Sequence, residues 1–471
     1  MPNLRPLLLI AIVLCLLATT GSTTLWGQRP GGVAQIEDSP SVISKFIARL
    51  PKPVRDRDYY DNGRPDPLKV ELGRLLFFDK LLSGNRNISC ASCHHSLTDT
   101  GDGLSLPVGE GGRGLGMTRD TGSGLDSIHE RVPRNAPPVF NLGAREFQRM
   151  FHDGRLEVDP SQPSGFISPA GDDLPQGLDN VLAAQAMFPV TSPTEMAGQG
   201  NENEISQAAA LGDLPLLWER LAIRLRANDT YVELFIQTFP DINAREDITY
   251  VHAANAIGAF EASAWRADQS PFDRFLRGDR QAMSVKARRG MNLFYGKAGC
   301  VACHNGSFQT DQEFHAVCMP QIGPGKGDGD GGHEDFGREQ ATGDEADRFK
   351  FRTPTLRNVA LTGPWGHVGA FNDLRDMVLH QLDTVRSMQS YDRDQVVLPY
   401  REDLAAIDFQ VLDDSDLVAD IVEANELKPR RLSKKEVDLL MEFMYALTDP
   451  NSIDIRRDTP MAVPSGLPLA D

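Results

Sequence analysis

The chain has 471 residues, of which 40% are hydrophobic and 24% are charged, and this composition is globular rather than disordered. Its length exceeds what one ordinary core organises, so two domains plus extensions are expected. The formal net charge of −18 argues against a nucleic-acid partner, because a phosphate backbone demands an excess of Lys and Arg. A basic protein partner or a small neutral substrate fits the acidity better, and solubility alone explains it equally well.

The first 28 residues resemble an export signal. One Arg precedes an apolar run of about a dozen residues, and small polar residues follow. The run is short for a membrane-spanning helix, yet no clean small-x-small cleavage site follows it. We therefore predict that residues 1–28 are a signal peptide or an N-terminal anchor, that residues 29–58 are a linker, and that the protein is periplasmic.

Residues 65–83, PDPLKVELGRLLFFDKLLS, are predicted as an amphipathic helix that leads into CASCH at 90–94. Residues 101–127 are Gly-rich and must form a loop. A phosphate cradle is set aside there, because no GK[ST] follows. No convincing strand alternation is present, and helical patterns return at residues 180–188, 213–227 and 251–265.

The second half of the chain repeats this order. Residues 270–283 lead into a helical segment that ends in CVACH at 300–304, which indicates two copies of one module. The loop 323–348 is rich in Gly and Asp; D-x-D spacing alone is weak evidence for calcium, so a solvated loop is expected. Residues 451–471 are predicted to be a disordered tail.

Four of the six Cys belong to the two C-x-x-C-H pentapeptides. Two thiols three residues apart add to the vinyl groups of a haem, and the following His places its imidazole nitrogen under the iron. Zinc is the main alternative, but the two pairs are far apart and each has its own His; redox disulfides fit less well still. We predict two c-type haems, attached through Cys90 and Cys93 with His94 as proximal ligand, and through Cys300, Cys303 and His304.

The sequence from about residue 60 to 450 resembles the bacterial di-haem cytochrome c peroxidases and their MauG-type relatives. The motifs that carry the resemblance stand in the family order: CASCH, RNAPPVFN (134–141), FHDGR (151–155), QAMFPVTSPTEM (185–196), FDRFLRGD (272–279), CVACH, FRTPTLRNVALTGP (351–364) and GHVG (366–369). Two haem sites alone would suit any di-haem cytochrome, whereas this ordered set identifies the family.

The resemblance implies a mainly α-helical fold with two cytochrome c-like domains, each around one covalently bound haem. The N-terminal, peroxidatic domain would span residues 59–275, and the C-terminal, electron-transfer domain residues 276–450. The resemblance also implies a calcium ion between the domains, held by Asn135 and the carbonyls of Thr362 and Pro364. Family members are often homodimers.

Splitting a peroxide O–O bond requires an iron with one open face and a group that moves a proton from the inner oxygen to the outer one. Glu195 matches the distal carboxylate of the family, and Gln185 and Pro189 match distal-pocket residues. A lone Glu in a loop is ordinarily a solvated charge, but its place within the whole motif favours the catalytic role. Glu195 is therefore predicted as the acid/base catalyst over the first haem.

The second haem is expected to be a six-coordinate electron store, whose potential depends on the ligand opposite His304. That ligand is Met in the peroxidases and Tyr in MauG. Counting from Pro364 in this chain leads to His380 or Gln381, of which only His380 is a good ligand, with Met377 and Met388 as fallbacks. An isolated helical His is otherwise an ordinary core or surface residue.

Several residues depart from the family pattern or have no clear counterpart. His152 stands where peroxidases carry a Trp between the haems, and residues 156–180 form an insertion that could reshape access to the first haem. His129 lies near the position at which many peroxidases carry a loop His that binds the first iron and blocks it. We expect the first iron of this protein to be open. The other expectations are that His95 is a surface neighbour, that His315 and His367 are structural hydrogen-bonders, and that His333 and Cys318 have no catalytic part.

The expected function is that of an exported peroxidase that reduces hydrogen peroxide at the N-terminal haem. Electrons would come through the C-terminal haem from a small donor protein, a cytochrome c or a cupredoxin. The first alternative is MauG-type oxidation of a side chain on a partner protein, which His152 and the absence of a Met ligand favour. The second is a plain electron-transfer cytochrome, against which the Glu195 pocket argues.

Overall fold

The computed structural model describes residues 50–470, so the expected signal peptide and most of the linker lie outside the described residues. Residues 50–471 cluster as one compact unit. Across the described part, the longest and most apolar helices still fall short of what a membrane span needs. The boundary predicted between residues 275 and 276 falls inside a short helix, Pro271–Leu276, and the division into two domains stays a prediction.

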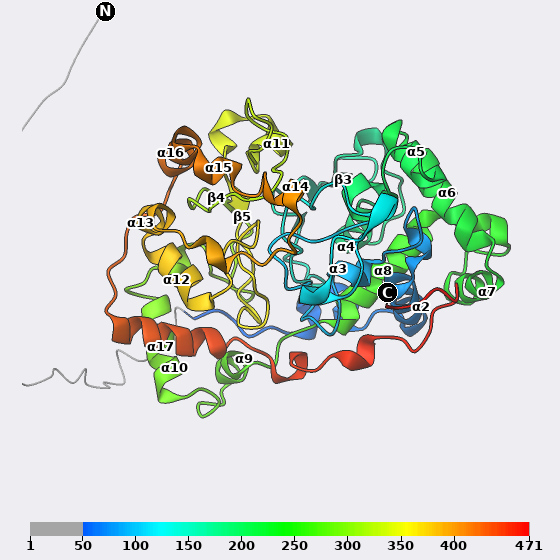
Figure 1. Cartoon of the computed structure of the whole chain (residues 1–471). Coiled ribbons are helices and arrows are strands. Elements are labelled where there is room, and N and C mark those ends of the chain that lie inside the picture. Colours follow the sequence, from blue (N-terminus) through cyan, green and yellow to red (C-terminus); the bar gives the residue numbers. More distant parts are fainter. Residues whose placement is uncertain (1–49, 471) are drawn as a thin grey trace, which may run out of the picture. The chain divides into compact units, whose positions relative to one another are not determined.

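Helices form most of the regular structure (Figure 1). In the first half of the chain, α2 (Pro67–Phe78) confirms the helix predicted before the first pentapeptide, and Asp66 caps it by accepting from the Leu68 amide at 2.8 Å. α2 packs along α8 (Tyr250–Ala264), where a Cβ on Gly73 would lie 1.8 Å from the Ala256 carbonyl oxygen. The other helices of this half are α3 (Cys90–Cys93), α4 (Val181–Gln185), α5 (Glu204–Ala210), α6 (Leu214–Arg226) and α7 (Asp229–Thr238).

The second half repeats this packing. α10 (Val285–Phe294) precedes the second pentapeptide and packs along α17 (Lys434–Tyr445). A Cβ on Gly290 would lie 1.9 Å from the Leu439 carbonyl oxygen, so a glycine again permits the close approach. The remaining helices are α9 (Pro271–Leu276), α11 (Glu339–Thr342), α12 (Leu374–Leu382), α13 (Thr384–Gln389), α14 (Glu402–Ala405), α15 (Gln410–Asp413) and α16 (Ser415–Glu423).

The described strands are only two or three residues long, which is too short for alternation to show in the sequence. The insertion after FHDGR supplies β2 and β3, which join β1, just before FHDGR, in a three-stranded antiparallel sheet of order β1-β2-β3. In this sheet Met150 pairs with Leu156 and Val158 with Phe166. A second antiparallel pair joins β4 to β5. The bounds are β1 (Arg149–Met150), β2 (Leu156–Val158), β3 (Phe166–Ile167), β4 (Phe314–His315) and β5 (Phe351–Arg352).

The C-terminal segment differs from the expectation of disorder. After α17 it runs back toward α2 and α7 (Figure 1, red), and Ile455 and Val463 join the hydrophobic core of the first half. The Ser465 hydroxyl donates to Asp79 at 2.6 Å, and the Asn228 amide donates to the Pro464 carbonyl at 3.0 Å. The polar, Pro-rich composition hides these few anchoring residues.

Candidate active site

The first pentapeptide forms one helical turn, α3, which presents both thiols and ends at the histidine. The His94 amide donates to the Cys90 carbonyl at 3.0 Å. The Nδ1 atom of His94 lies 3.1 Å from the Thr100 carbonyl oxygen. With Nδ1–H donating there, Nε2 keeps its lone pair free for iron, which is the usual device of haem and metal sites.

The second pentapeptide makes the same two contacts. The His304 amide donates to the Cys300 carbonyl at 2.9 Å, and His304 Nδ1 lies 3.1 Å from the Gln309 carbonyl oxygen. Thr100 (φ 65°) and Gln309 (φ 50°) both adopt left-handed backbone. Burial lowers the pKa of both imidazoles, although nearby carbonyls oppose it, so they remain neutral as a metal ligand must. Both turns therefore fit a c-type haem.

The four thiols do not fit the zinc alternative. All four are free of disulfides, and burial raises the pKa of Cys90 and Cys300 to about 12. Within residues 50–470, one cluster of three metal-ligand types occurs, at Cys303, Asp311 and His315. The two cysteine pairs do not converge on a common centre.

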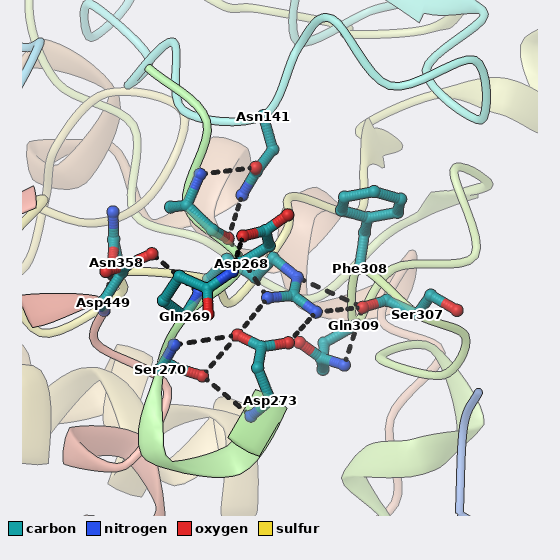
Figure 2. A network of polar contacts seen from close by, with 12 residues as sticks. Asn141, Asp268, Gln269, Ser270, Asp273, Ser307, Phe308, Gln309, Asn358 and Asp449 are labelled. Atoms are coloured by element: carbon teal, nitrogen blue, oxygen red, sulfur yellow. Dashed lines mark hydrogen bonds and ion pairs between the residues drawn. The ribbon is translucent and has the colours of Figure 1, made fainter. Parts of the chain in front are cut away.

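A buried ion pair braces the second turn (Figure 2). Arg357 binds Asp273 through two hydrogen bonds of 2.7 and 2.8 Å, and both side chains are almost fully buried. Arg357 Nη2 also donates to the Ser307 carbonyl at 2.6 Å, inside the loop between His304 and Gln309. The motifs 272–279 and 351–364 thus meet beneath the turn that orients the second imidazole.

The structure assembles the predicted distal residues in successive turns. Gln185 ends α4, Pro189 begins a 3₁₀ turn (Pro189–Thr191), and Glu195 lies in a π turn, η8 (Pro193–Ala197). In η8 three successive amides, of residues 195 to 197, donate to the Ser192 carbonyl at 2.9–3.2 Å. Such π turns are frequent at functional sites. A Cβ on Gly109 would lie 1.8 Å from the Thr194 carbonyl oxygen, so the Gly-rich loop backs the Glu195 turn closely.

Glu195 is half-buried and acts electrostatically on the first attachment turn. Burial raises the pKa of its carboxyl, whereas Arg155, Lys326 and a hydrogen bond from Ser192 pull it down. After burial, the charge of Glu195 is among the influences that raise the pKa of Cys90 and Cys93. Glu195 thus acts electrostatically on the first attachment turn, and its role as acid/base catalyst stays a prediction.

Four charged residues near this site were not identified from the sequence. Burial raises the pKa of Glu261 to about 8 and that of Asp102 to about 7, and each acts on one thiol of the first turn. Arg155 belongs to the FHDGR motif and could have been singled out there. Lys326 comes from the loop that we expected to be merely solvated.

His380 is fully buried on α12, beside the Phe371 ring. Its Nε2 atom lies 3.0 Å from the Val317 carbonyl oxygen, and its Nδ1 atom has no partner in the described part of the chain. Burial lowers its pKa to about 4, so it is a neutral imidazole with one unused nitrogen. Those properties fit an axial ligand, and the assignment stays a prediction. The fallback Met388 packs with the Cys318 thiol in a separate apolar cluster.

His152 contacts Asn135, one of the three predicted calcium positions. His152 Nε2 is 3.1 Å from the Asn135 carbonyl oxygen, and burial lowers the His152 pKa to about 4, with help from Arg134. The Asn135 amide group donates to the Leu104 and Ser105 carbonyls at 2.9 and 3.2 Å. These contacts do not test the predicted calcium site, which consists of Asn135 and the carbonyls of Thr362 and Pro364. The site stays a prediction.

For the other histidines, the structure confirms some of the expected environments and contradicts others. His315 hydrogen-bonds Glu426 at 2.9 Å and Asp311 at 3.3 Å, as expected of a structural residue. His367 is wrong as a hydrogen-bonder, because it stacks on Phe351 at 3.7 Å and both ring nitrogens lack partners among the described residues. His95 is buried against Phe78 rather than on the surface, and His129 is exposed.

The insertion also borders a cavity. Its residues 173–179 line a hollow of ≈ 620 Å³ together with Trp218, Phe239 and Tyr250. Lys69 and Asp179 also line this cavity, and the Lys69 ammonium pairs with the Asp179 carboxylate at 2.8 Å. The expectation that the insertion reshapes access to the first haem stays a prediction.

Two C-x-x-C-H turns, each with a His held by a backbone carbonyl, fit a di-haem c-type oxidoreductase. Residues 67–281 match the family model of the di-haem cytochrome c peroxidases, and the chain belongs to this family. It is 31% identical to the methylamine utilization protein MauG of Methylorubrum extorquens over 317 residues, 67% of this chain and 69% of the relative. It is 30% identical to the cytochrome c551 peroxidase of Pseudomonas aeruginosa over 328 residues, 69% and 75% of the two chains.

Solved structures agree on the fold. A MauG-like protein associated with microbial copper homeostasis superposes with a TM-score of 0.54 at 25% identity, over 89% of this chain and 97% of that one. The di-haem peroxidase BthA of Burkholderia thailandensis also gives 0.54, at 21% identity, over 83% and 88%. The protein is a haem oxidoreductase that acts on hydrogen peroxide and carries two c-type haems.

Proposed function

We propose that this protein reduces hydrogen peroxide at the haem attached through Cys90 and Cys93, and that electrons arrive through the haem attached through Cys300 and Cys303. The observation that carries the proposal is Glu195: a half-buried carboxyl in a π turn, electrostatically coupled to the first attachment turn. A plain electron carrier has no use for such a group.

The bound haem supplies an iron that can take up peroxide and store oxidising equivalents. Glu195 takes a proton from the inner oxygen and gives it to the outer one, which leaves as water. Two electrons and two further protons complete the conversion of one peroxide to two waters. Gln185 and Pro189 shape the pocket, and the Thr100 carbonyl holds His94 in the tautomer that leaves Nε2 for the iron.

The second haem would have His304 and His380 as its two ligands. Two neutral imidazoles give a lower potential than a His/Met pair. His152, neutral and half-buried, would occupy the path on which related peroxidases carry Trp. The exposed His129 supports a first iron that is open at rest.

Other parts of the proposal concern surroundings and partners. The predicted export signal and the c-type haems support a periplasmic location, and the net charge of −18 favours a basic donor, a small cytochrome c or a cupredoxin. A calcium ion at Asn135, Thr362 and Pro364, and a homodimer, belong to the same proposal.

A second candidate is MauG-type oxidation of a side chain on a partner protein. His152 in place of Trp and His380 in place of Met favour it. The 31% identity to MauG is in line with it but decides nothing, because a peroxidase is equally similar.

Turnover with a reduced donor tests the proposal. The reduced donor should be oxidised with a stoichiometry of two per peroxide, and Glu195→Gln should lower kcat/KM by about 10²- to 10⁴-fold while both haems remain attached. Glu233→Gln, on the exposed side of α7, is the control. A long-lived oxidised state without donor turnover would favour the MauG-type candidate.

Electron paramagnetic resonance of the ferric protein tests the resting state. One high-spin and one low-spin signal are expected from an open first iron and a bis-His second one. Two low-spin signals would contradict the open site.

A further inference from the structure

A run of exposed basic residues leads into α17. Residues 428–435 read KPRRLSKK, so five of these eight positions carry a positive charge and none carries a negative one. All five side chains are exposed, and none makes an ion pair or a hydrogen bond with another described residue. The five are Lys428, Arg430, Arg431, Lys434 and Lys435. They form a surface, which we call the basic patch, with a positive local field on a chain whose formal net charge is −18.

The carboxylates that flank the basic patch in the sequence do not neutralise it, because each has another partner. These pairs are Glu426 with His315 at 2.9 Å, Glu436 with Lys297 at 2.7 Å and Asp438 with Arg375 at 2.6 Å. The charge of the patch is therefore balanced by solvent and small ions, which a carboxylate-rich surface can replace.

The basic patch lies against the turn that would hold the second haem. The Arg430 guanidinium lies 3.3 Å from the position that a Cβ of Gly299 would occupy, and Gly299 directly precedes Cys300. Burial raises the pKa of the Cys300 thiol, and the Arg430 charge is among the influences that oppose it. The ion pair between Lys297 and Glu436 joins the start of α17 to the same turn. The patch is thus placed beside the second attachment turn by direct contacts.

The same segment contacts the helix that carries His380. The Arg430 amide donates to the carbonyl of Leu382, the last residue of α12, at 2.7 Å. In this half of the molecule α10, α12 and α17 lie together (Figure 1). Leu379, one turn before Leu382, is 42% exposed, so an apolar side chain is also accessible close to this contact. One hydrogen bond and two residues therefore separate the basic patch from the predicted ligand of the second iron.

Local charge decides which partner docks at such a place, because charges more than about 8 Å apart are largely screened at physiological salt. We propose that the basic patch is the docking surface of the electron donor, and that this donor presents a carboxylate-rich face around its redox centre. The inference rests on the proposed route of electrons through the second haem. A donor that is acidic at its contact face takes the place of the basic donor that net charge alone favours.

The test measures binding to the two-haem protein in its resting ferric state. The probe is plastocyanin, a small copper protein with an acidic face. Isothermal titration calorimetry should show a complex at low ionic strength that weakens as salt is added. Lys428→Glu and Arg431→Glu should each raise the dissociation constant, and together they should raise it by about tenfold or more. Lys428→Arg combined with Arg431→Lys should retain the affinity.

Arg113→Glu is the control for net charge, because Arg113 is an exposed cation of the first half without an ion pair among the described residues. Its dissociation constant should equal that of the wild type. A second measurement uses carbodiimide, which joins a lysine amine to a carboxylate as an amide. Mass spectrometry should find plastocyanin linked to Lys428, Lys434 or Lys435.

Equal plastocyanin affinity in the wild type and in the charge-reversed protein, with native thermal unfolding, would overturn the inference. Binding to vesicles of anionic phosphatidylglycerol without binding to plastocyanin would also overturn it, because the patch would then serve a membrane surface. Neither readout needs peroxide. A complex that depends on Lys428 and Arg431 in a protein without donor turnover would therefore refute the proposed function and leave the docking surface standing.

Discussion

At the scale of single residues, the attachment turns depend on carbonyls and ion pairs that hold them before any cofactor chemistry begins. Asp273 is the clearest example, since it is fully buried and meets Arg357 in a bidentate pair. Arg357 in turn holds the Ser307 carbonyl. The orientation of His304 thus depends on a residue that is distant in sequence.

Replacing Asp273 by Asn should lower the free energy of unfolding by about 3–5 kcal/mol, because a buried Arg357 would lose its compensating charge. Urea unfolding of the two-haem protein measures this. Asp413→Asn, which removes an exposed partner of Arg393, should cause no comparable loss. A loss as small as that of the control would show that the pair is not needed for stability.

Much of the site can be predicted from individual residues, and the reason is chemical. The pentapeptides around His94 and His304 are dictated by covalent attachment, and Glu195 is found through its motif. Glu261 and Asp102 could not be singled out, because their raised pKa values come from burial that only the folded chain creates. The burial of His95 was missed for the same reason: Phe78, which covers it, is contributed by α2.

At the scale of elements, loop 323–340 and the FHDGR turn are joined by Arg134, Asp153 and Asp335. Burial alone would raise the pKa of both carboxyls, but the Arg134 guanidinium beside them holds each pKa below its ordinary value. Such groups stabilise the fold above the unfolded-state pKa, and the stabilisation is lost as the pH falls toward the lower folded-state pKa.

The contribution of Asp153 and Asp335 to the free energy of unfolding should therefore be complete at neutral pH and should decrease as the pH falls below about 4. Asp335→Asn should be less stable at neutral pH and show a shallower acid dependence, because one of the linked carboxyls is gone. Denaturant unfolding at a series of pH values measures both effects. An unchanged acid slope in Asp335→Asn would mean that other carboxylates cause the acid sensitivity.

The long helices were predictable because α2, α8 and α10 carry clear caps or periodicity. The short strands and the insertion were not, since a strand such as β3 has only two residues. Which helices pair could not be predicted either. The close contacts at Gly73 and Gly290 depend on the absence of a side chain, and hydrophobic periodicity does not reveal such contacts.

At the scale of the whole described molecule, the C-terminal segment ties the two halves together. It leaves α17 in the second half and inserts Ile455 and Val463 into the core of the first. Ser465 then binds Asp79, directly after α2.

A chain shortened to end at residue 451 should lose about 3–6 kcal/mol of stability, because burial of each of the two apolar side chains contributes about 1.5–3 kcal/mol. Thermal unfolding followed by haem absorbance tests this. Removal of residues 470–471 is the matched control and should leave the transition in place. Equal transitions in both shortened chains would contradict an anchoring role.

The same segment has a consequence for the order of maturation. Residues 455–465 are synthesised after both C-x-x-C-H turns, yet they complete the core around the first of them. The first half therefore cannot close fully until this late segment has been made and delivered. Throughout synthesis and delivery, the CASCH turn therefore belongs to an unfinished core.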